Sequence, residues 1–175
     1  MKIESVEPVL IDKYLFVRIK TDNGLIGVGE SGAWGFPEAS AGAVEVFQEY
    51  LLGKDPLKIE YHSQYLYQSF HFRGAAIMGA LSAIDIALWD IAGKYYGVPV
   101  LRLLGGGDRF RDKIRTYKHI KASNIQEQIH LILKAKEEGY TAVGHLNPFL
   151  DPSYDEIRQS LPFVKKINFA IEAVP

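Results

Sequence analysis

An apolar stripe through residues 77–95 is the feature that most constrains how this chain folds. Its members recur at steps of four and three residues, which places them on one face of an α-helix. The stripe consists of Ile77, Leu81, Ile84, Leu88, Ile91 and Tyr95. Gly97 and Pro99 follow and end this helix, which we expect over residues 75–95. A helix with such a stripe needs a second apolar surface, and its small residues at 79, 80, 83 and 87 favour a close approach.

The N-terminal residues predict a small antiparallel sheet. Residues 15–20 alternate between apolar and other side chains, and an Asn-Gly dipeptide at 23–24 separates them from residues 25–30, which is a strong hairpin signal. Residues 3–11 are expected to form a third strand. Pro8 within it favours an edge position or a bulge, because proline cannot donate to a strand ladder.

Two more helices are expected between this sheet and the apolar helix. Pro37 suits the first position of one helix, and Gly53 is its expected stop. Asp55 can cap the next helix with Pro56 in its first position, and the Arg-Gly pair at 73–74 ends it. We therefore expect helices near residues 38–52 and 57–70.

From residue 111 the pattern changes to strands that alternate with helices. Strands are expected over 114–120 and 141–146, and helices over 125–138 and 155–173. A two-stranded parallel sheet leaves both of its edges open, so a unit of this kind normally continues. We therefore expect further βα units beyond residue 175 in the complete protein.

A glycine-rich run at 105–108 marks the change of pattern. We place a domain boundary there, with one α+β domain over residues 1–107 and an incomplete βα domain over residues 108–175. The fold class is thus a three-stranded antiparallel sheet with helices, followed by about two βα units.

Composition excludes several functions. The net charge is −1 without a basic cluster, so a nucleic-acid partner is not expected. The chain has no cysteine, which excludes disulfides and thiolate chemistry. No signal peptide and no span long enough to cross a bilayer is recognised, so we expect a cytoplasmic protein without a membrane partner.

The helix that carries the stripe also carries a family pattern. Residues 80–94 read ALSAIDIALWDIAGK, and GVPV at 97–100 and LLGG at 103–106 follow. This run resembles, almost position for position, the signature of the mandelate racemase and muconate lactonizing enzyme group of the enolase superfamily. Further resemblance lies in residues 24–30, 53–56 and 111–117. It covers essentially the whole chain.

This resemblance implies an α+β capping domain that closes over a (β/α) barrel, of which about two units are present. The implied chemistry is abstraction of a proton α to a carboxylate, with Mg²⁺ stabilising the enediolate. In the family the metal ligands lie at the ends of the third to fifth barrel strands, so no metal ligand is expected in this chain. A complete relative would be a Mg²⁺-dependent lyase, isomerase or racemase, expected as a homo-oligomer that acts on a small carboxylate or acid sugar.

Candidate substrate-binding residues lie in two segments of the capping domain. The family places a specificity loop where this chain has residues 30–36, which makes Trp34 and Phe36 candidates for substrate contact; simple packing of the loop is the alternative. His71 and Arg73 precede the signature helix. Arg73 can bind a carboxylate in bidentate fashion and His71 can donate to a hydroxyl, although a surface or domain-interface pair would look the same.

The end of the second barrel strand offers one candidate catalytic residue, His145. Relatives commonly carry a lysine there, whereas this chain has none, and a histidine can exchange a proton near neutral pH. The departure from lysine favours an acid-sugar dehydratase over a racemase. A packed histidine without a catalytic role is the alternative.

The acidic residues of the signature helix are expected to be structural. Asp85 should hydrogen-bond backbone at the interface with the barrel, Asp90 and Lys94 should form an exposed pair four residues apart, and Trp89 should lie in the core. The leading hypothesis is therefore the lid and specificity loops of a dehydratase. The alternative is a non-catalytic fragment or an interaction module.

Overall fold

The computed structural model describes residues 1–33, 35–69, 71–105 and 113–144. The chain forms two compact units, Met1–Phe110 and Arg111–Pro175. The expected domain boundary at residues 107 and 108 lies outside the described residues, as does the expected helix at 155–173.

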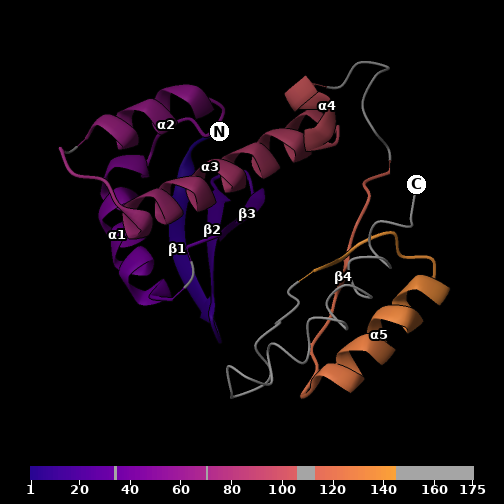
Figure 1. Ribbon diagram of the computed structural model, residues 1–175. Coiled ribbons are helices and arrows are strands. Elements are labelled where there is room, and N and C mark those ends of the chain that lie inside the picture. Colours follow the sequence, from indigo (N-terminus) through magenta and orange to yellow (C-terminus); the bar gives the residue numbers. More distant parts are fainter. Residues whose placement is uncertain (34, 70, 106–112, 145–175) are drawn as a thin grey trace. The chain divides into compact units, whose positions relative to one another are not determined.

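The first unit opens with the expected antiparallel sheet (Figure 1). Its strands are β1 (Ile3–Ile11), β2 (Tyr14–Thr21) and β3 (Ile26–Ser31), in the order β1-β2-β3. Pro8 lies opposite Val17 on β1, an edge strand, as predicted. The register irregularity of β1 lies between Ile3 and Ser5, so the bulge is near the start of the strand and away from the proline.

The Asn-Gly hairpin between β2 and β3 is also confirmed. The amide of Gly24 donates to the carbonyl of Thr21 and the amide of Thr21 donates to the carbonyl of Leu25, both at 2.9 Å. Gly24 has a φ of 86°, which a residue without a Cβ adopts at little cost. The loop is therefore a turn closed by a glycine in the left-handed region.

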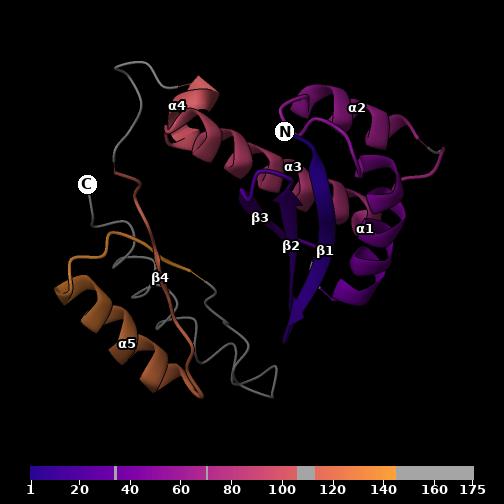
Figure 2. The same cartoon turned by 180° about the vertical axis from the view of Figure 1, so that it is seen from behind.

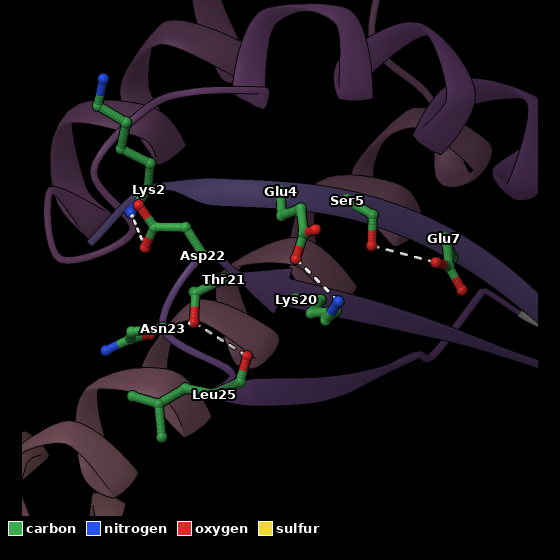
Figure 3. A network of polar contacts seen from close by, with 9 residues as sticks. All are labelled: Lys2, Glu4, Ser5, Glu7, Lys20, Thr21, Asp22, Asn23 and Leu25. Atoms are coloured by element: carbon green, nitrogen blue, oxygen red, sulfur yellow. Dashed lines mark hydrogen bonds and ion pairs between the residues drawn. The ribbon is translucent and has the colours of Figure 1, made fainter.

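The sheet face that carries Lys20 holds two ion pairs between β1 and β2, one of which is drawn in Figure 3. Lys20 pairs with Glu4 at 2.9 Å, and Arg18 pairs with Glu7. The hydrogen bond and charge of Arg18 lower the pKa of the Glu7 carboxyl. These side chains are exposed, so each pair adds little to stability.

Four helices complete the described part of the first unit, and they differ from the prediction at α2 and at α4. They are α1 (Pro37–Leu51), α2 (Ile59–Gln68), α3 (Ala75–Tyr96) and α4 (Val100–Gly105). Helix α2 begins later than expected: Asp55 accepts a hydrogen bond from the amide of Leu57 at 3.0 Å within a turn, and Lys58 is the N-cap. Asp55 therefore orders the turn before the helix rather than capping it. Sequence analysis predicted no helix at α4.

The core lies between one face of the sheet and the helices, as seen from behind in Figure 2. β2 contributes Leu15, Val17 and Ile19. The other principal members are Val6, Val44, Leu51, Ile84, Leu88 and Ile91. The predicted stripe of α3 is therefore the centre of the core, although Tyr95 is exposed and Trp89 is only partly buried.

Helix α3 corrects one exclusion drawn from the sequence. The sequence analysis predicted no span long and apolar enough to cross a membrane. By length and composition alone, however, this helix of 22 residues would be sufficient. Half of its most apolar stretch is buried against the sheet and the other helices. A helix that is the centre of a protein core has the same composition, because its face is apolar over its whole length.

The second unit contains one β-α-β arrangement among its described residues. β4 (Lys118–His119) and β5 (Val143–Gly144) pair in parallel, and α5 (Ile125–Glu137) connects them. Ile120, Ile132 and Ala135 form its buried cluster. The helix matches the prediction, whereas β4 is much shorter than the expected strand at 114–120.

Candidate functional site

Two glycines let β3 lie directly on α3. A Cβ on Gly27 would be 2.1 Å from the carbonyl oxygen of Ala87, and one on Gly29 would be 2.0 Å from that of Ala83. No side chain fits at such distances from backbone, so only glycine permits this approach. The small residues Ala83 and Ala87 of α3 thus allow the close approach that was predicted for them. Their partners on β3, Gly27 and Gly29, are two residues apart and so lie on the same face of the strand.

This contact runs in a defined direction. Gly27 faces Ala87 and Gly29 faces Ala83, so β3 runs antiparallel to α3. At the end of β3, a Cβ on Gly79 would be 2.6 Å from both the Ser31 hydroxyl and the Cβ of Ala33. The chain that follows β3 therefore contacts the N-terminal part of α3.

Asp90 and Lys94 bind the N-terminal part of β3. Their ion pair, 2.7 Å long, was predicted, but both side chains also bind the strand. Asp90 accepts a hydrogen bond from the amide of Val28 at 3.0 Å, and Lys94 donates to the carbonyl of Ile26 at 2.6 Å. The pair is thus a link between helix and sheet.

The loop after β3 contains two candidate substrate-binding residues. Phe36 is 81% exposed and is the N-cap residue of α1, with its carbonyl accepting from the amide of Ala39 at 3.1 Å. An aromatic ring with this exposure is available for contact with a ligand or another surface. Trp34 lies outside the described residues.

The second segment, residues 71–74, leads directly into α3. Gly74 is the N-cap of that helix, and its carbonyl accepts from the amide of Met78 at 2.9 Å. His71 is exposed. Because Gly79 contacts the chain after β3, both candidate segments lie at the N-terminal end of α3.

Arg73 turns back toward α2. Its Nε donates to the carbonyl of Tyr67 at 2.8 Å, and its guanidinium lies 4.0 Å from the centroid of the Tyr67 ring. This places a cation at the C-terminal end of a helix, where it is favourable. The contacts hold the side chain in place while the residue stays exposed.

Arg73 also borders a cavity of about 410 Å³ that sequence analysis did not anticipate. The cavity lies between α1, α2 and the residues before α3. Aromatic and aliphatic side chains line most of it, and Tyr50, Tyr65, Tyr67 and Phe72 are among the aromatic ones. Tyr50 and Tyr65 stack with ring centroids 3.8 Å apart, and His62 accepts from or donates to the Tyr50 hydroxyl at 3.0 Å.

Asp85 differs from the prediction in its partners. It forms side-chain hydrogen bonds with Ser63 of α2 and with Trp89, one turn further along α3. Burial raises the pKa of the Asp85 carboxyl, and the nearby Glu60 adds to the rise. The carboxyl therefore joins side chains of α2 and α3, whereas a hydrogen bond to backbone had been predicted.

The second unit places two strand ends side by side. β4 and β5 are parallel, with the amide of Lys118 donating to the carbonyl of Ala142 at 2.9 Å. Their C-terminal ends, at His119 and Gly144, therefore share one edge. His145 follows immediately but lies outside the described residues, so its proposed role stays a prediction.

A metal site requires several acidic or histidine side chains close together. Within residues 1–33, 35–69, 71–105 and 113–144, no three His, Asp or Glu side chains gather closely enough to hold an ion. The described residues therefore do not fit a Mg²⁺ site.

Comparison with known proteins identifies the family. Residues 3–105 match the model of the mandelate racemase / muconate lactonizing enzyme N-terminal domain. The matched range covers the sheet and the helices α1 to α4 of the first unit. The chain belongs to this family.

Curated relatives and solved structures agree with this assignment. A D-galactonate dehydratase of Verminephrobacter eiseniae is 41% identical over 130 residues, which are 74% of this chain and 34% of the relative. One of Variovorax paradoxus is 45% identical over 109 residues, which are 62% of this chain and 28% of the relative. The chain thus spans about a third of the length of these relatives.

Two solved structures share the fold over most of the chain. A member of the enolase superfamily from Salmonella Typhimurium has a TM-score of 0.78 at 30% identity, covering 99% of this chain and 52% of that one. An enolase from Pantoea ananatis, with bound D-gluconate and Mg, has a TM-score of 0.71 at 33% identity, covering 81% and 35%. The residues described above therefore correspond to part of longer proteins.

Proposed function

We propose that this chain supplies the capping domain and first barrel units of an acid-sugar dehydratase. The observation that carries the proposal is the family match over residues 3–105 together with the dehydratase relatives at 41% and 45% identity. The exposed Phe36 and the fixed Arg73 border the end of α3 where both candidate segments meet. This part of the chain would contact the substrate as a lid.

The proposed reaction begins with removal of the proton α to the substrate carboxylate. The hydroxyl on the next carbon then leaves as water, and the resulting enol becomes an α-keto acid. Mg²⁺, when bound by the complete enzyme, would stabilise the enediolate. Because the described residues do not fit that ion, we assign its ligands to other parts of the complete enzyme.

His145 would exchange a proton with the substrate or bind one of its hydroxyls. The absence of the lysine that relatives commonly carry at this strand end favours a dehydratase over a racemase. Replacing His145 by Asn in the complete enzyme should lower kcat on the acid sugar that the enzyme prefers. An unchanged kcat would assign the residue to packing.

The proposal is tested with two proteins. The complete natural gene product should convert at least one member of an acid-sugar panel to an α-keto acid in the presence of Mg²⁺. The 175-residue chain of 19.6 kDa should show no turnover and no micromolar Mg²⁺ binding by calorimetry. Lack of activity in a complete gene product whose intact mass is well above 19.6 kDa would favour the alternative, an interaction module.

The substrate-binding residues have their own test in the complete enzyme. Trp34, Phe36, His71 and Arg73 are each replaced by Ala. We expect changed relative kcat/KM values across acid sugars with unaltered Mg²⁺ affinity. Tyr96→Ala is the matched control, because Tyr96 is an exposed aromatic residue at the opposite end of α3. Equal effects in the control and the four variants would contradict a specificity role.

A further inference from the structure

The free edge of β3 carries the observation that goes furthest beyond the proposed function. β3 pairs only with β2 in its sheet, so one row of its backbone groups faces away from the ladder. Thr21 and Leu25 form a hydrogen-bonded pair, and such pairs alternate along antiparallel strands. The amides and carbonyls of Ile26 and Val28 therefore point outward.

Two of these four outward groups bind side chains of α3. The Val28 amide donates to Asp90 at 3.0 Å and the Ile26 carbonyl accepts from Lys94 at 2.6 Å. One acceptor and one donor, joined in an ion pair of 2.7 Å, take the positions that a neighbouring strand would supply. An edge strand otherwise offers such groups to solvent or to another chain.

We propose that Asp90 and Lys94 are positioning residues that act in place of a fourth strand and thereby fix the loop after β3. The link holds one end of β3, the glycine contacts hold its middle, and Gly79 holds the chain at Ser31 and Ala33. A strand held at all three points cannot slide along α3. Only the substrate role of the loop rests on the proposed function.

Amide hydrogen exchange of the full 175-residue chain, measured by NMR, tests the proposal. In Asp90→Ala the Val28 amide should exchange about tenfold faster, the effect of losing one well-formed hydrogen bond. The Ala33 amide, which donates to the Ser31 hydroxyl at 3.4 Å, should also exchange faster. In Asp90→Asn a side-chain carbonyl remains as acceptor, so exchange at Val28 should be close to wild type.

The matched control is Glu4→Ala. It removes an ion pair of similar length and exposure between Glu4 and Lys20, away from the edge of β3 (Figure 3). It should leave the exchange rates of the Val28 and Ala33 amides unchanged. If Asp90→Ala fails to fold, Lys94→Met, which frees the Ile26 carbonyl and keeps an apolar stem, should still accelerate exchange in β3 and at Ala33.

Two results would overturn the proposal. One is unchanged exchange at Val28 in every folded variant. The other is acceleration at Val28 with no change at Ala33, which would separate the edge link from the loop. In the complete enzyme, Asp90→Ala should also shift relative kcat/KM among acid sugars while Asp90→Asn restores them. Altered exchange in an enzyme that converts no acid sugar would reject the proposed function and retain the positioning role.

Discussion

The two units of this chain bury their apolar residues in different ways. In the first unit, three strands and the helices enclose a continuous core that includes Val17, Ile84 and Leu88. In the described part of the second, the cluster of buried apolar residues consists of Ile120 and of Ile132 and Ala135 on α5, and Ile114 is 83% exposed. The difference follows from the sheets: three antiparallel strands covered by helices on one face enclose a core, whereas a two-stranded parallel sheet leaves both of its edges open.

The largest expected effect tests the contact between β3 and α3. Gly29→Val would place a branched side chain within about 2 Å of the Ala83 carbonyl, so strand and helix must separate. We expect the first unit to lose about 4 kcal/mol or more of unfolding free energy. Tryptophan fluorescence in a urea titration reports this unit alone, because both tryptophans, Trp34 and Trp89, belong to it.

Gly42→Ala is the control for that substitution. Gly42 lies within α1, and a methyl group on its Cα would have no other atom within 4 Å, so alanine fits there. We expect a gain of about 0.5–1 kcal/mol, because alanine favours a helix over glycine. A loss of similar size in both variants would show that the tight contact is not what limits stability.

The second prediction tests whether the cores of the two units contribute independently to stability. Leu88→Ala removes a fully buried side chain and should cost the first unit about 3 kcal/mol. Ile132→Ala should disorder the second unit while the fluorescence transition stays in place. Urea titrations followed by fluorescence and by NMR of α5 amides distinguish the two. A shared shift in both signals would mean that the units unfold together.

A third effect concerns a buried polar residue. His62 is 1% exposed, and its ring nitrogens contact the Tyr50 hydroxyl at 3.0 Å and the Asp55 carbonyl at 2.8 Å. His62→Leu leaves both partners without this hydrogen bond, so we expect a loss of about 2 kcal/mol in the first unit. Glu138→Ala, which breaks the exposed ion pair with Lys118 in the second unit, should change its stability by less than about 1 kcal/mol. Equal losses would contradict this ranking.

The smallest effect is a pH dependence. The pKa of Asp85 is raised in the folded first unit, so the folded state holds its proton more tightly than the unfolded state does. Its favourable contribution is present below the ordinary pKa of 3.8 and is lost as pH rises through the folded pKa. Asp85→Asn should therefore be at least as stable as wild type at neutral pH, with a flatter pH profile. A steeper profile in urea titrations between about pH 3 and pH 7 would exclude this assignment.

Much of the fold could be predicted from local patterns. The Asn-Gly turn, the alternation in β2 and the stripe of α3 each follow from residues close together in the chain, and the structure has all three. The start of α2 was missed because Asp55 and Pro56 suit a turn as well as a helix cap. Local chemistry alone does not distinguish the two.

The candidate site depends on distant contacts, and these were harder to predict. Asp90 was expected to pair with Lys94 only, because its contact with Val28 joins residues 62 positions apart. The partners of Asp85 and the aromatic cavity also arise from packing of α2 against its neighbours. One signal was present in the sequence: glycines alternate at 27 and 29 in a strand, which indicates close approach of another backbone.

The position of α3 in the chain has a consequence for biosynthesis. An apolar helix of 22 residues is a hazard to a nascent protein when nothing covers it. Strands β2 and β3 and helices α1 and α2, which pack on α3, all precede it in the sequence. The ribosome therefore releases this helix only after it has made most of the surface that buries it, so its apolar face can be covered as soon as it emerges.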